Sequence, residues 1–358
     1  QRNARECGDR VAFIERDARV TWSEVWDRCR RLAGHLLTLG VSKGDVVGIQ
    51  LPNSLEFIYA LGAVNAIGAV ACPHLATLRR SELRFVLGFS EAVVTIVPEN
   101  DGKGFFYCDL LNDLWPELPN LRKVLVVGAG KELAENCISM ERLLSTDADL
   151  PDLDRRLGEL APGRHDVNRL LFTSGSTGDP KGVLHTYATT TFSNVQTNRD
   201  YKVDKNSVLL LFVPITLNWG MFHVIQCALA RCKLILFRDF SVAQVLSAVE
   251  RERVTHLGGP PTALVALQRD GTYASYDLSS VLAYTTSGAS CPIELLQQCR
   301  RELSWPIIEG YGMTECGWIA ANSIDDMPEE TVGTVGRPFP GIEIRLENIA
   351  GVGDGAEG

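Results

Sequence analysis

Short apolar stretches alternate along the chain with longer stretches whose apolar residues recur at helical spacing. The first kind predicts buried strands, and the second predicts amphipathic helices. In the first half of the chain, the expected strands are 11–14, 20–22, 46–51, 69–72, 92–97 and 123–127. The helices expected among them run from the capping box Thr21–Glu24 to Gly40, from 55 to 67, and onward from 81. This alternation is typical of parallel sheets covered by helices.

The same alternation returns in the second half. The expected strands are 208–213, 233–237, 254–257 and 281–286, and the expected helices are 186–198, 219–230, 242–252, one opened by Pro260 and Pro261, and 292–303. Beyond Trp318 the chain is rich in Gly and Pro, and Ile342–Leu346 alternates like a strand of a small β module. We therefore predict an α/β protein with two doubly wound, mostly parallel sheets packed with helices, plus a small, incomplete β-barrel-like module. The expected units are 1–162, 163–316 and 317–358.

Length and charge narrow the class of protein. A chain of 358 residues can form more than one domain, and 45% hydrophobic with 22% charged residues is an ordinary globular balance. The net charge is −9, and the basic cluster Arg28–Arg31 lies in a helical pattern with Glu24 and Asp27. A nucleic-acid surface is therefore not expected. An anionic ligand would be held by local charge and backbone dipoles.

The spacing of the cysteines indicates the redox state of the compartment, and the apolar runs indicate whether a membrane span is expected. The ten cysteines are scattered, with neither a Cys-x-x-Cys pair nor zinc spacing, and they predict a reducing, cytoplasmic compartment. The first residues are too polar for a signal peptide. The most apolar run, Phe57–Cys72, is interrupted by Asn65, so we expect a buried helix and strand there and no membrane span.

The stretch Leu170–Tyr187 carries the strongest chemical signal. An apolar strand runs into glycines that free backbone N–H groups, into hydroxyl donors and then into a lysine, a composition that suits phosphate groups. It is not a Walker A loop, and a flexible Ser/Gly linker rarely lies between a strand pattern and a helix pattern. The residues expected to bind phosphate are Thr173, Ser174, Gly175, Ser176, Thr177, Gly178 and Lys181.

A second informative stretch is Ile307–Glu315. A short strand leads to an exposed aromatic between glycines, followed by a hydroxyl and a carboxylate. Tyr311 could stack on a base, Thr314 could donate to a phosphate oxygen, and Glu315 could hold Mg²⁺. Because ligands bind beyond the carboxyl ends of strands in open α/β sheets, this segment is well placed to meet the first one. The alternative is a plain strand-to-helix turn in which Thr314 and Glu315 cap a helix.

In this order, the two stretches resemble the motifs of the adenylate-forming superfamily, which includes acyl-CoA synthetases, peptide-synthetase adenylation domains and luciferase-like ligases. A third segment, Thr286–Ser290, resembles the family's Gly-Gly-Ala segment. The resemblance covers essentially the whole chain and implies ATP, Mg²⁺ and coenzyme A as ligands. It implies catalytic roles for Lys181, Thr314 and Glu315, with Glu315 on the metal. The nucleotide contacts that it adds to the phosphate loop are Ser287, Gly288, Ala289, Glu309, Tyr311, Gly312 and Thr314.

The first difference from the family's pattern lies in a segment expected to line the pocket for the acid. Many acyl-CoA synthetases have Pro-x-x-His-x-x-Gly where this chain has Pro214–Gly220, so that Leu217 stands in the position of the His. The acyl pocket is then gated differently, or the nearby His223 replaces the missing ring. The expected pocket residues are Leu217, Trp219, Gly220 and Gly288, and a Trp there favours a compact, cyclic or medium-length acyl group.

The second difference from the family's pattern lies at the C-terminal end of the sequence. The family's later segments, including the C-terminal lid domain with its catalytic Lys, are absent, so the chain resembles the large N-terminal portion of such an enzyme, and we expect it to be weakly active or inactive. The alternatives are an adenylation domain that loads a carrier protein, a non-catalytic nucleotide-binding module, and a structural or interaction protein. The sequence leaves open which acid is used and whether the chain forms a homodimer.

Overall fold

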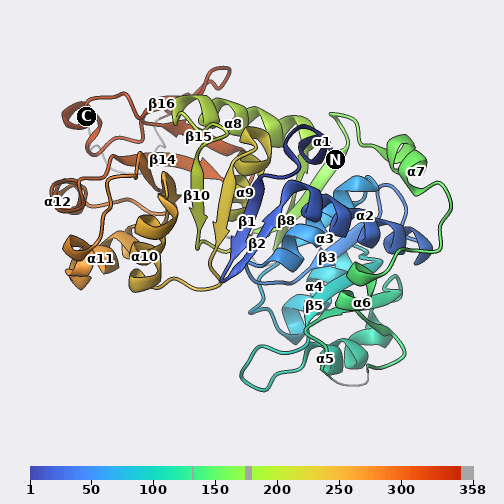
Figure 1. Cartoon of the computed structure of the whole chain (residues 1–358). Coiled ribbons are helices and arrows are strands. Elements are labelled where there is room, and N and C mark those ends of the chain that lie inside the picture. The colour runs from blue at the N-terminus through green and yellow to red at the C-terminus, as the bar shows by residue number, and fades with distance from the viewer. Residues whose placement is uncertain (131–132, 174–179, 348–358) are drawn as a thin grey trace.

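A computed structural model describes residues 1–130, 133–173 and 180–347 and shows a mixed α/β fold with two large sheets (Figure 1). The seven-stranded sheet is parallel except for its last strand, β9, which runs antiparallel to β8. In spatial order its strands are β7 (Cys137–Ser139), β6 (Lys123–Val127), β5 (Val94–Pro98), β3 (Val46–Ile49), β4 (Val70–Pro73), β8 (Val167–Thr173) and β9 (Lys181–Thr186). The helices of this half are α2 (Trp22–Thr38), α3 (Leu55–Ala66), α4 (Arg80–Phe89), α5 (Tyr107–Leu114), α6 (Met140–Ser145) and α7 (Leu153–Leu160).

The nine-stranded sheet has a parallel centre and antiparallel ends. In spatial order its strands are β16 (Arg337–Pro338), β15 (Gly317–Ala321), β14 (Ile307–Met313), β13 (Ala283–Thr286), β12 (His256–Gly258), β10 (Val208–Leu211), β11 (Lys233–Leu236), β1 (Val11–Glu15) and β2 (Ala18–Thr21). Its helices are α8 (Tyr187–Asp200), α9 (Asn218–Ala230), α10 (Val242–Glu252), α11 (Pro261–Asp270), α12 (Ile293–Leu303) and α13 (Pro328–Thr331), while α1 (Arg2–Cys7) starts the chain. The expected fold class is confirmed.

The sheets cross the expected boundaries between units. The β1–β2 hairpin comes from the first 162 residues, yet β1 pairs with β11 of the larger sheet, with Phe13 opposite Leu234. Conversely, β8 and β9 follow residue 163 and complete the smaller sheet beside β4. A strand's apolar pattern shows that it is buried but does not specify its neighbour, which explains the difference. The division into units stays a prediction.

The end of the described chain also differs from expectation. Strands β15 and β16 extend the larger sheet antiparallel to β14, whereas Ile342–Leu346 is not a strand. The prediction of a strand there was wrong, because an alternating pattern needs a neighbouring strand to pair with, and Leu346 is instead 92% exposed.

Side chains from both sheets fix the two halves against each other. One hydrophobic core contains Leu61 of α3 together with Leu209 of β10. Asn53, which follows β3, donates to the carbonyls of Val213 and Phe237 at 3.0 and 2.9 Å and accepts from the N–H of Ile215 at 2.6 Å. The loops after β3, β10 and β11 are therefore held together, which fixes the end of the larger sheet where the candidate site lies.

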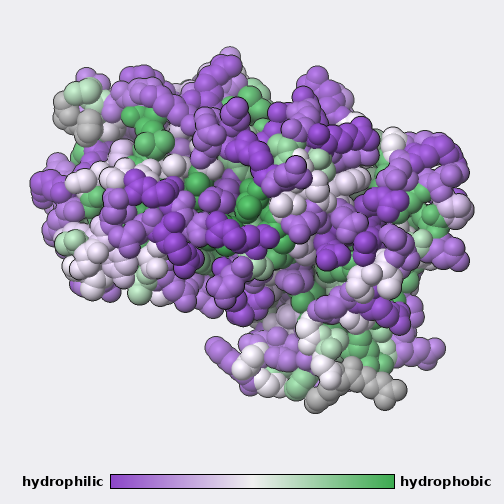
Figure 2. All heavy atoms as spheres, in the orientation of Figure 1, coloured by the Kyte–Doolittle hydropathy of each residue, from purple (hydrophilic) through white to green (hydrophobic). Residues whose placement is uncertain are grey.

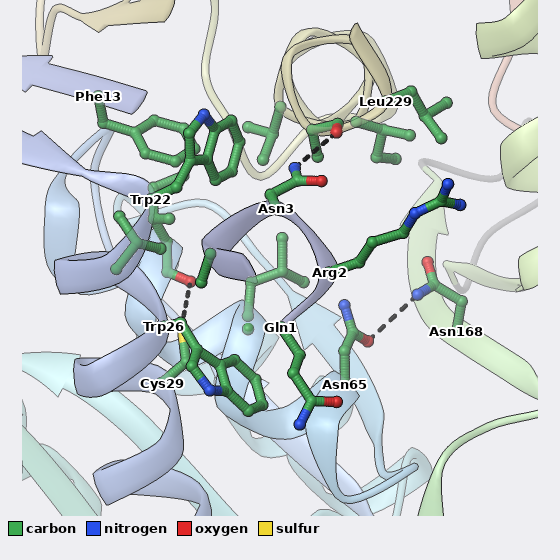
Figure 3. Close-up of a pocket in the computed structure, with 18 of the residues that line it drawn as sticks. Gln1, Arg2, Asn3, Phe13, Trp22, Trp26, Cys29, Asn65, Asn168 and Leu229 are labelled. Carbon is green, nitrogen blue, oxygen red and sulfur yellow. Dashed lines mark hydrogen bonds between the residues drawn. The ribbon is translucent and has the colours of Figure 1, made fainter. Parts of the chain in front are cut away.

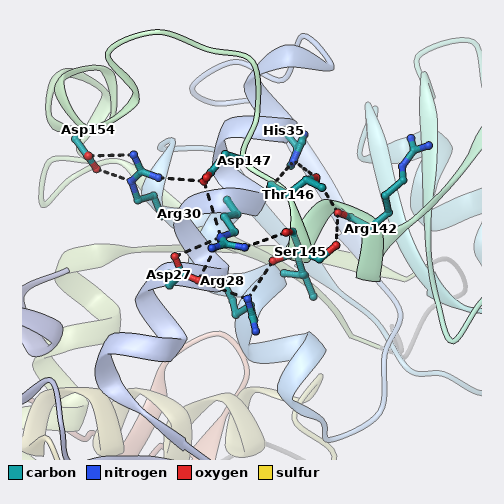
Figure 4. Close-up of polar contacts among 11 residues, drawn as sticks. Asp27, Arg28, Arg30, His35, Arg142, Ser145, Thr146, Asp147 and Asp154 are labelled. Carbon is teal, nitrogen blue, oxygen red and sulfur yellow. Dashed lines mark hydrogen bonds and ion pairs between the residues drawn. The ribbon is translucent and has the colours of Figure 1, made fainter.

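Helix α2 begins and packs as its sequence predicts. Thr21 and Glu24 form the capping box, and the apolar positions at helical spacing are buried. Its arginines are engaged in polar contacts (Figure 4): Arg30 meets Asp154 at 2.9 and 3.1 Å, and Arg31 meets Asp27 and the Ser145 carbonyl. These contacts join α2 to the α6–α7 segment, although exposed ion pairs contribute little stability each.

The length of the helices and the character of the surface bear on whether the chain could span a membrane. Within the described part of the chain, no helix combines the length and apolar character that a membrane crossing needs. The face in Figure 2 is mainly hydrophilic, with hydrophobic residues in scattered patches.

Candidate active site

The two strands on either side of the predicted phosphate loop form an antiparallel pair, called here the β8–β9 hairpin. Strands β8 and β9 pair from Val167 opposite Thr186 to Thr173 opposite Lys181. The expected phosphate ligands Ser174, Gly175, Ser176, Thr177 and Gly178 lie outside the described residues. Alternate residues of a strand share a face, so Lys181 and His185 lie on one side of β9, and Leu184, which is 63% exposed, lies on the other.

The second stretch forms a tight corner between two strands. Strand β14 ends at Met313, Thr314 and Glu315 follow in the turn, and β15 returns antiparallel from Gly317, whose φ is +72°. The alternative in which Thr314 and Glu315 cap a helix was therefore wrong. Gly312 must be a glycine for a steric reason, because a Cβ there would lie 2.6 Å from the Gly317 carbonyl oxygen on the facing strand.

The hairpin and the corner meet through His185. Its buried ring interacts with the Thr314 backbone and with the charge of Glu315, and both raise the pKa of His185. Burial and then the positive charge of Arg169 outweigh them and lower this pKa to about 4, so the ring is neutral at neutral pH. Because Lys181 points to the same side of β9 as His185, the structure brings Lys181, Thr314 and Glu315 to one side of the hairpin.

A cavity of about 250 Å³ adjoins the corner. It lies beyond the carboxyl ends of three parallel strands of the larger sheet, β10, β13 and β14, where ligands bind in such folds. The ring centroids of Trp219 and Phe222 lie 6.4 and 5.8 Å from that of Trp318, so the wall is aromatic. The cavity is lined by Leu217, Asn218, Trp219, Phe222, Ser287, Gly288, Gly312, Met313, Thr314, Gly317 and Trp318.

Six of these lining residues were predicted from the sequence: Leu217, Trp219, Ser287, Gly288, Gly312 and Thr314. Gly288 has a φ of +83°, and a Cβ there would lie 3.8 Å from Trp219. Sequence reasoning missed Asn218, Phe222, Met313, Gly317 and Trp318. The aromatic Trp318 directly after a turn glycine was a usable signal, but its position in the wall depends on how β15 pairs with β14.

The other predicted residues lie elsewhere. Gly220 packs tightly at the start of α9, where a Cβ would lie 2.1 Å from the Pro214 carbonyl oxygen. The buried Glu309 accepts from the Gly333 N–H at 3.3 Å, and burial raises the pKa of its carboxyl. Tyr311 is 46% exposed, and Ala289 is also exposed. Their contacts with a nucleotide stay predictions.

His223 is a buried residue of α9, one turn after Trp219. Its Nδ1 lies 3.0 Å from the Trp219 carbonyl oxygen, and burial lowers its pKa to about 4. It does not line the 250 Å³ cavity.

Another cavity, of about 410 Å³, lies between α1, α2, α3 and α9 (Figure 3). Trp22, Trp26 and Phe13 form part of its mainly apolar wall, and Asn65 and Asn168 stand at its polar side. It contains none of the predicted site residues.

The Glu315 carboxylate at the corner suits a metal ion that binds together with substrate phosphates. No group of three or more His, Cys, Asp or Glu side chains that could hold a metal occurs in residues 1–130, 133–173 and 180–347. Mg²⁺ is often held by one or two carboxylates together with substrate phosphates, so the exposed carboxylate of Glu315 fits that role.

Comparison with known proteins gives consistent matches along the chain. The sequence model of a family described as AMP-binding enzyme matches residues 1–358. The chain is 31% identical over 339 residues to 4-coumarate-CoA ligase 3 of Arabidopsis thaliana, covering 92% of this chain and 57% of that protein. It is 28% identical over 340 residues to 2-succinylbenzoate-CoA ligase of Bacillus subtilis (strain 168), covering 95% and 63%. The chain therefore spans less than two thirds of the length of these two relatives.

The fold has a clear match among solved structures. The anthranilate CoA ligase AuaEII, in complex with anthranoyl-AMP, superimposes with a TM-score of 0.83 at 22% identity, over 97% of this chain and 65% of that one. At this identity the likeness concerns the fold.

Proposed function

The chain belongs to the family of AMP-binding enzymes, and from this membership we propose that the whole protein activates a carboxylic acid with ATP. A carboxylate oxygen of the acid bonds to the α-phosphorus of ATP, the bond from that phosphorus to the bridging oxygen breaks, and pyrophosphate leaves. The product is an acyl-adenylate. The thiol of coenzyme A gives up its proton to solvent and its sulfur bonds to the acyl carbon. The bond from that carbon to the phosphate oxygen then breaks, and AMP leaves.

The observation that carries the proposal is the convergence of three features at one place. His185 of the β8–β9 hairpin lies close enough to the Thr314–Glu315 corner for both residues of the corner to affect its pKa, and Thr314 also lines the aromatic cavity. A nucleotide triphosphate joined to an acid needs this combination: donors for phosphates, a carboxylate for a metal, and an apolar place for the acyl group.

Each residue would contribute position or charge. Lys181 and the loop from Thr173 to Gly178 would hold the departing β- and γ-phosphates, and Glu315 would hold Mg²⁺ together with phosphate oxygens. Charge stabilisation of this kind is often the largest contribution that a protein makes to such a reaction. The contacts proposed for the adenosine and the α-phosphate come from Ser287, Gly288, Ala289, Glu309, Tyr311, Gly312 and Thr314.

The cavity favours a compact acid. Its 250 Å³ must also admit the carboxylate end near Thr314, and its aromatic walls suit a ring or a medium-length chain. Leu217, Trp219 and Gly288 would set the limit on acyl size, since they line the cavity. Coenzyme A as the acceptor and a cytoplasmic location stay predictions.

Two measurements test the proposal: Mg·ATP binding by the chain, and ATP–pyrophosphate exchange by the whole protein across a panel of single-ring, medium-chain and long-chain acids. We expect ATP to bind and exchange to require a compact acid. Lys181→Ala should lower the exchange rate about a hundred- to a thousandfold, whereas Lys103→Ala, at an exposed lysine beyond β5, should leave it unchanged. A chain that binds no Mg·ATP contradicts the proposal. Release of AMP with a carrier protein but not with coenzyme A would identify the other acceptor.

A further inference from the structure

Arg169 on β8 is a buried cation with unusual partners. The residue is 3% exposed, and its guanidinium donates to three neutral oxygens: Asn168 Oδ1 at 2.9 Å, Thr190 Oγ1 at 2.6 Å and Asn218 Oδ1 at 2.8 Å. Among the described residues, no carboxylate forms an ion pair with it. Burial lowers its pKa to about 10, so it remains charged at neutral pH. Because a buried charge without a counter-ion is destabilising, its presence calls for a functional reason.

Asn218 connects this charge to the corner. A guanidinium can only donate, so Arg169 fixes the Asn218 amide with its oxygen toward the arginine. The Asn218 Nδ2 then points to the Thr314 carbonyl oxygen, which lies 3.4 Å away. The position of Thr314 is therefore coupled to a side chain of β8, the strand that leads into the phosphate loop.

A second residue of the β8–β9 hairpin, His185, also lies near the corner. His185 on β9 interacts with the Thr314 backbone, and the Arg169 charge contributes to keeping its ring neutral. Asn218 thus contacts the corner by a hydrogen bond and His185 lies beside it, while Arg169 donates to Asn218 and its charge acts on His185.

The far side of Arg169 is anchored to neighbouring helices. Asn168, which accepts from Arg169, donates to Asn65 of α3 at 3.1 Å (Figure 3), and the hydroxyl of Tyr187 donates to the same Asn65 oxygen at 3.0 Å. Thr190 belongs to α8. The guanidinium is therefore fixed by α3, α8 and β8 before it reaches Asn218.

We propose that Arg169 is a positioning residue that, through Asn218, holds the Thr314–Glu315 corner against the β8–β9 hairpin so that the corner is already in place to receive the metal of Mg·ATP. The inference rests on the proposed function of this site. It assigns no contact between Arg169 and substrate.

The chain offers variants that separate positioning from stability. Arg169→Met removes the charge at similar length, and Asn218→Leu removes the connection to Thr314. Thr190→Val is the matched control, because it removes one hydrogen bond of Arg169 on the side away from the corner. Arg169→Lys retains the charge and can retain one donor.

The readout is how much Mg²⁺ strengthens ATP binding, measured by calorimetry with and without the metal, beside urea unfolding of each variant. We call the ratio of the ATP Kd without Mg²⁺ to the Kd with Mg²⁺ the Mg²⁺-dependent gain. Arg169→Met and Asn218→Leu should reduce this gain roughly tenfold or more, as expected for residues that support a metal ligand through hydrogen bonds. Thr190→Val should unfold at lower urea yet keep the gain, and Arg169→Lys should recover part of it. If Arg169→Met does not fold, Asn218→Leu provides the same test.

A Glu315→Gln background distinguishes positioning from a direct electrostatic effect. There the Arg169→Met change should have no further effect on ATP binding, because the metal ligand is already lost. An undiminished effect in that background, or an unchanged gain in both Arg169→Met and Asn218→Leu, overturns the inference. In either case wild-type Mg·ATP binding would leave the proposed function standing, whereas no ATP binding by the wild type would refute both.

Discussion

Gly310 on β14 provides a sharp test of how the cavity wall is built. A Cβ placed there would lie 2.1 Å from Cζ3 of Trp318, and also 2.8 and 3.0 Å from two further ring atoms. Ordinary contact begins at 3.4 Å, so Gly310→Ala requires the indole or the strand to move by 1.3 Å. The indole packs against Phe222 and Trp219, so it must crowd them or enter the cavity.

Gly310→Ala should therefore affect both stability and the acid. Overpacking of this kind lowers the free energy of unfolding by about 1–3 kcal/mol. Because Trp318 forms the cavity wall, we also expect the KM for a ring-shaped acid to rise several-fold, with a smaller effect on the KM for ATP. The measurements are urea unfolding and acid-dependent pyrophosphate exchange.

Gly88→Ala is the matched control. Gly88 lies in α4, where an added Cβ would make only ordinary contact with Leu118 at 3.8 Å, so alanine there should be neutral or stabilising by up to about 1 kcal/mol. Shortening the clashing ring in the double variant Gly310→Ala/Trp318→Leu should restore part of the stability. Wild-type unfolding and wild-type acid KM in Gly310→Ala would refute this description of the wall.

Three further predictions follow from particular contacts. Arg19, 2.7 Å from the buried Glu252 carboxylate, is the main cause that lowers the pKa of Glu252 to about 2, so its stabilisation is present above pH 4.5 and lost as the pH falls toward 2. Arg19→Met should lower stability at neutral pH and flatten this acid dependence in urea unfolding. Trp219→Ala should enlarge the cavity and raise kcat/KM for larger acids relative to compact ones in the exchange assay. Asn53→Ala removes three buried hydrogen bonds between the halves and should lower the unfolding free energy by about 3 kcal/mol, measured by urea unfolding.

Much of the fold could be predicted because its signals are local. The capping box at Thr21 begins α2, and the apolar runs at 46–51 and 123–127 contain β3 and β6. The sheet that accepts the β1–β2 hairpin could not be predicted, because Phe13 pairs with Leu234, a residue far away in sequence. Strand Lys181–Thr186 was missed for a similar reason, since a short strand at a sheet edge shows little beyond one buried residue, His185.

The residues of the candidate site likewise fall into those that local motifs predict and those whose roles depend on distant neighbours. Motif chemistry predicted roles for Lys181, Thr314 and Glu315, which stay predictions, and it predicted Trp219 and Gly288, which line the cavity. Asn218 and Trp318 were missed because their roles depend on what packs across from them. Arg169 had a signal that was not used, namely a charged residue directly before the apolar run Leu170–Phe172.

A crystal structure of the chain with Mg²⁺ and a non-hydrolysable ATP analogue tests the central claim most directly. We predict one nucleotide between the hairpin and the corner, with the Lys181 Nζ at a β- or γ-phosphate oxygen and the Glu315 carboxylate in the shell of the metal. A nucleotide bound elsewhere, or one that contacts Lys181 while Glu315 faces away from its metal, would contradict the account.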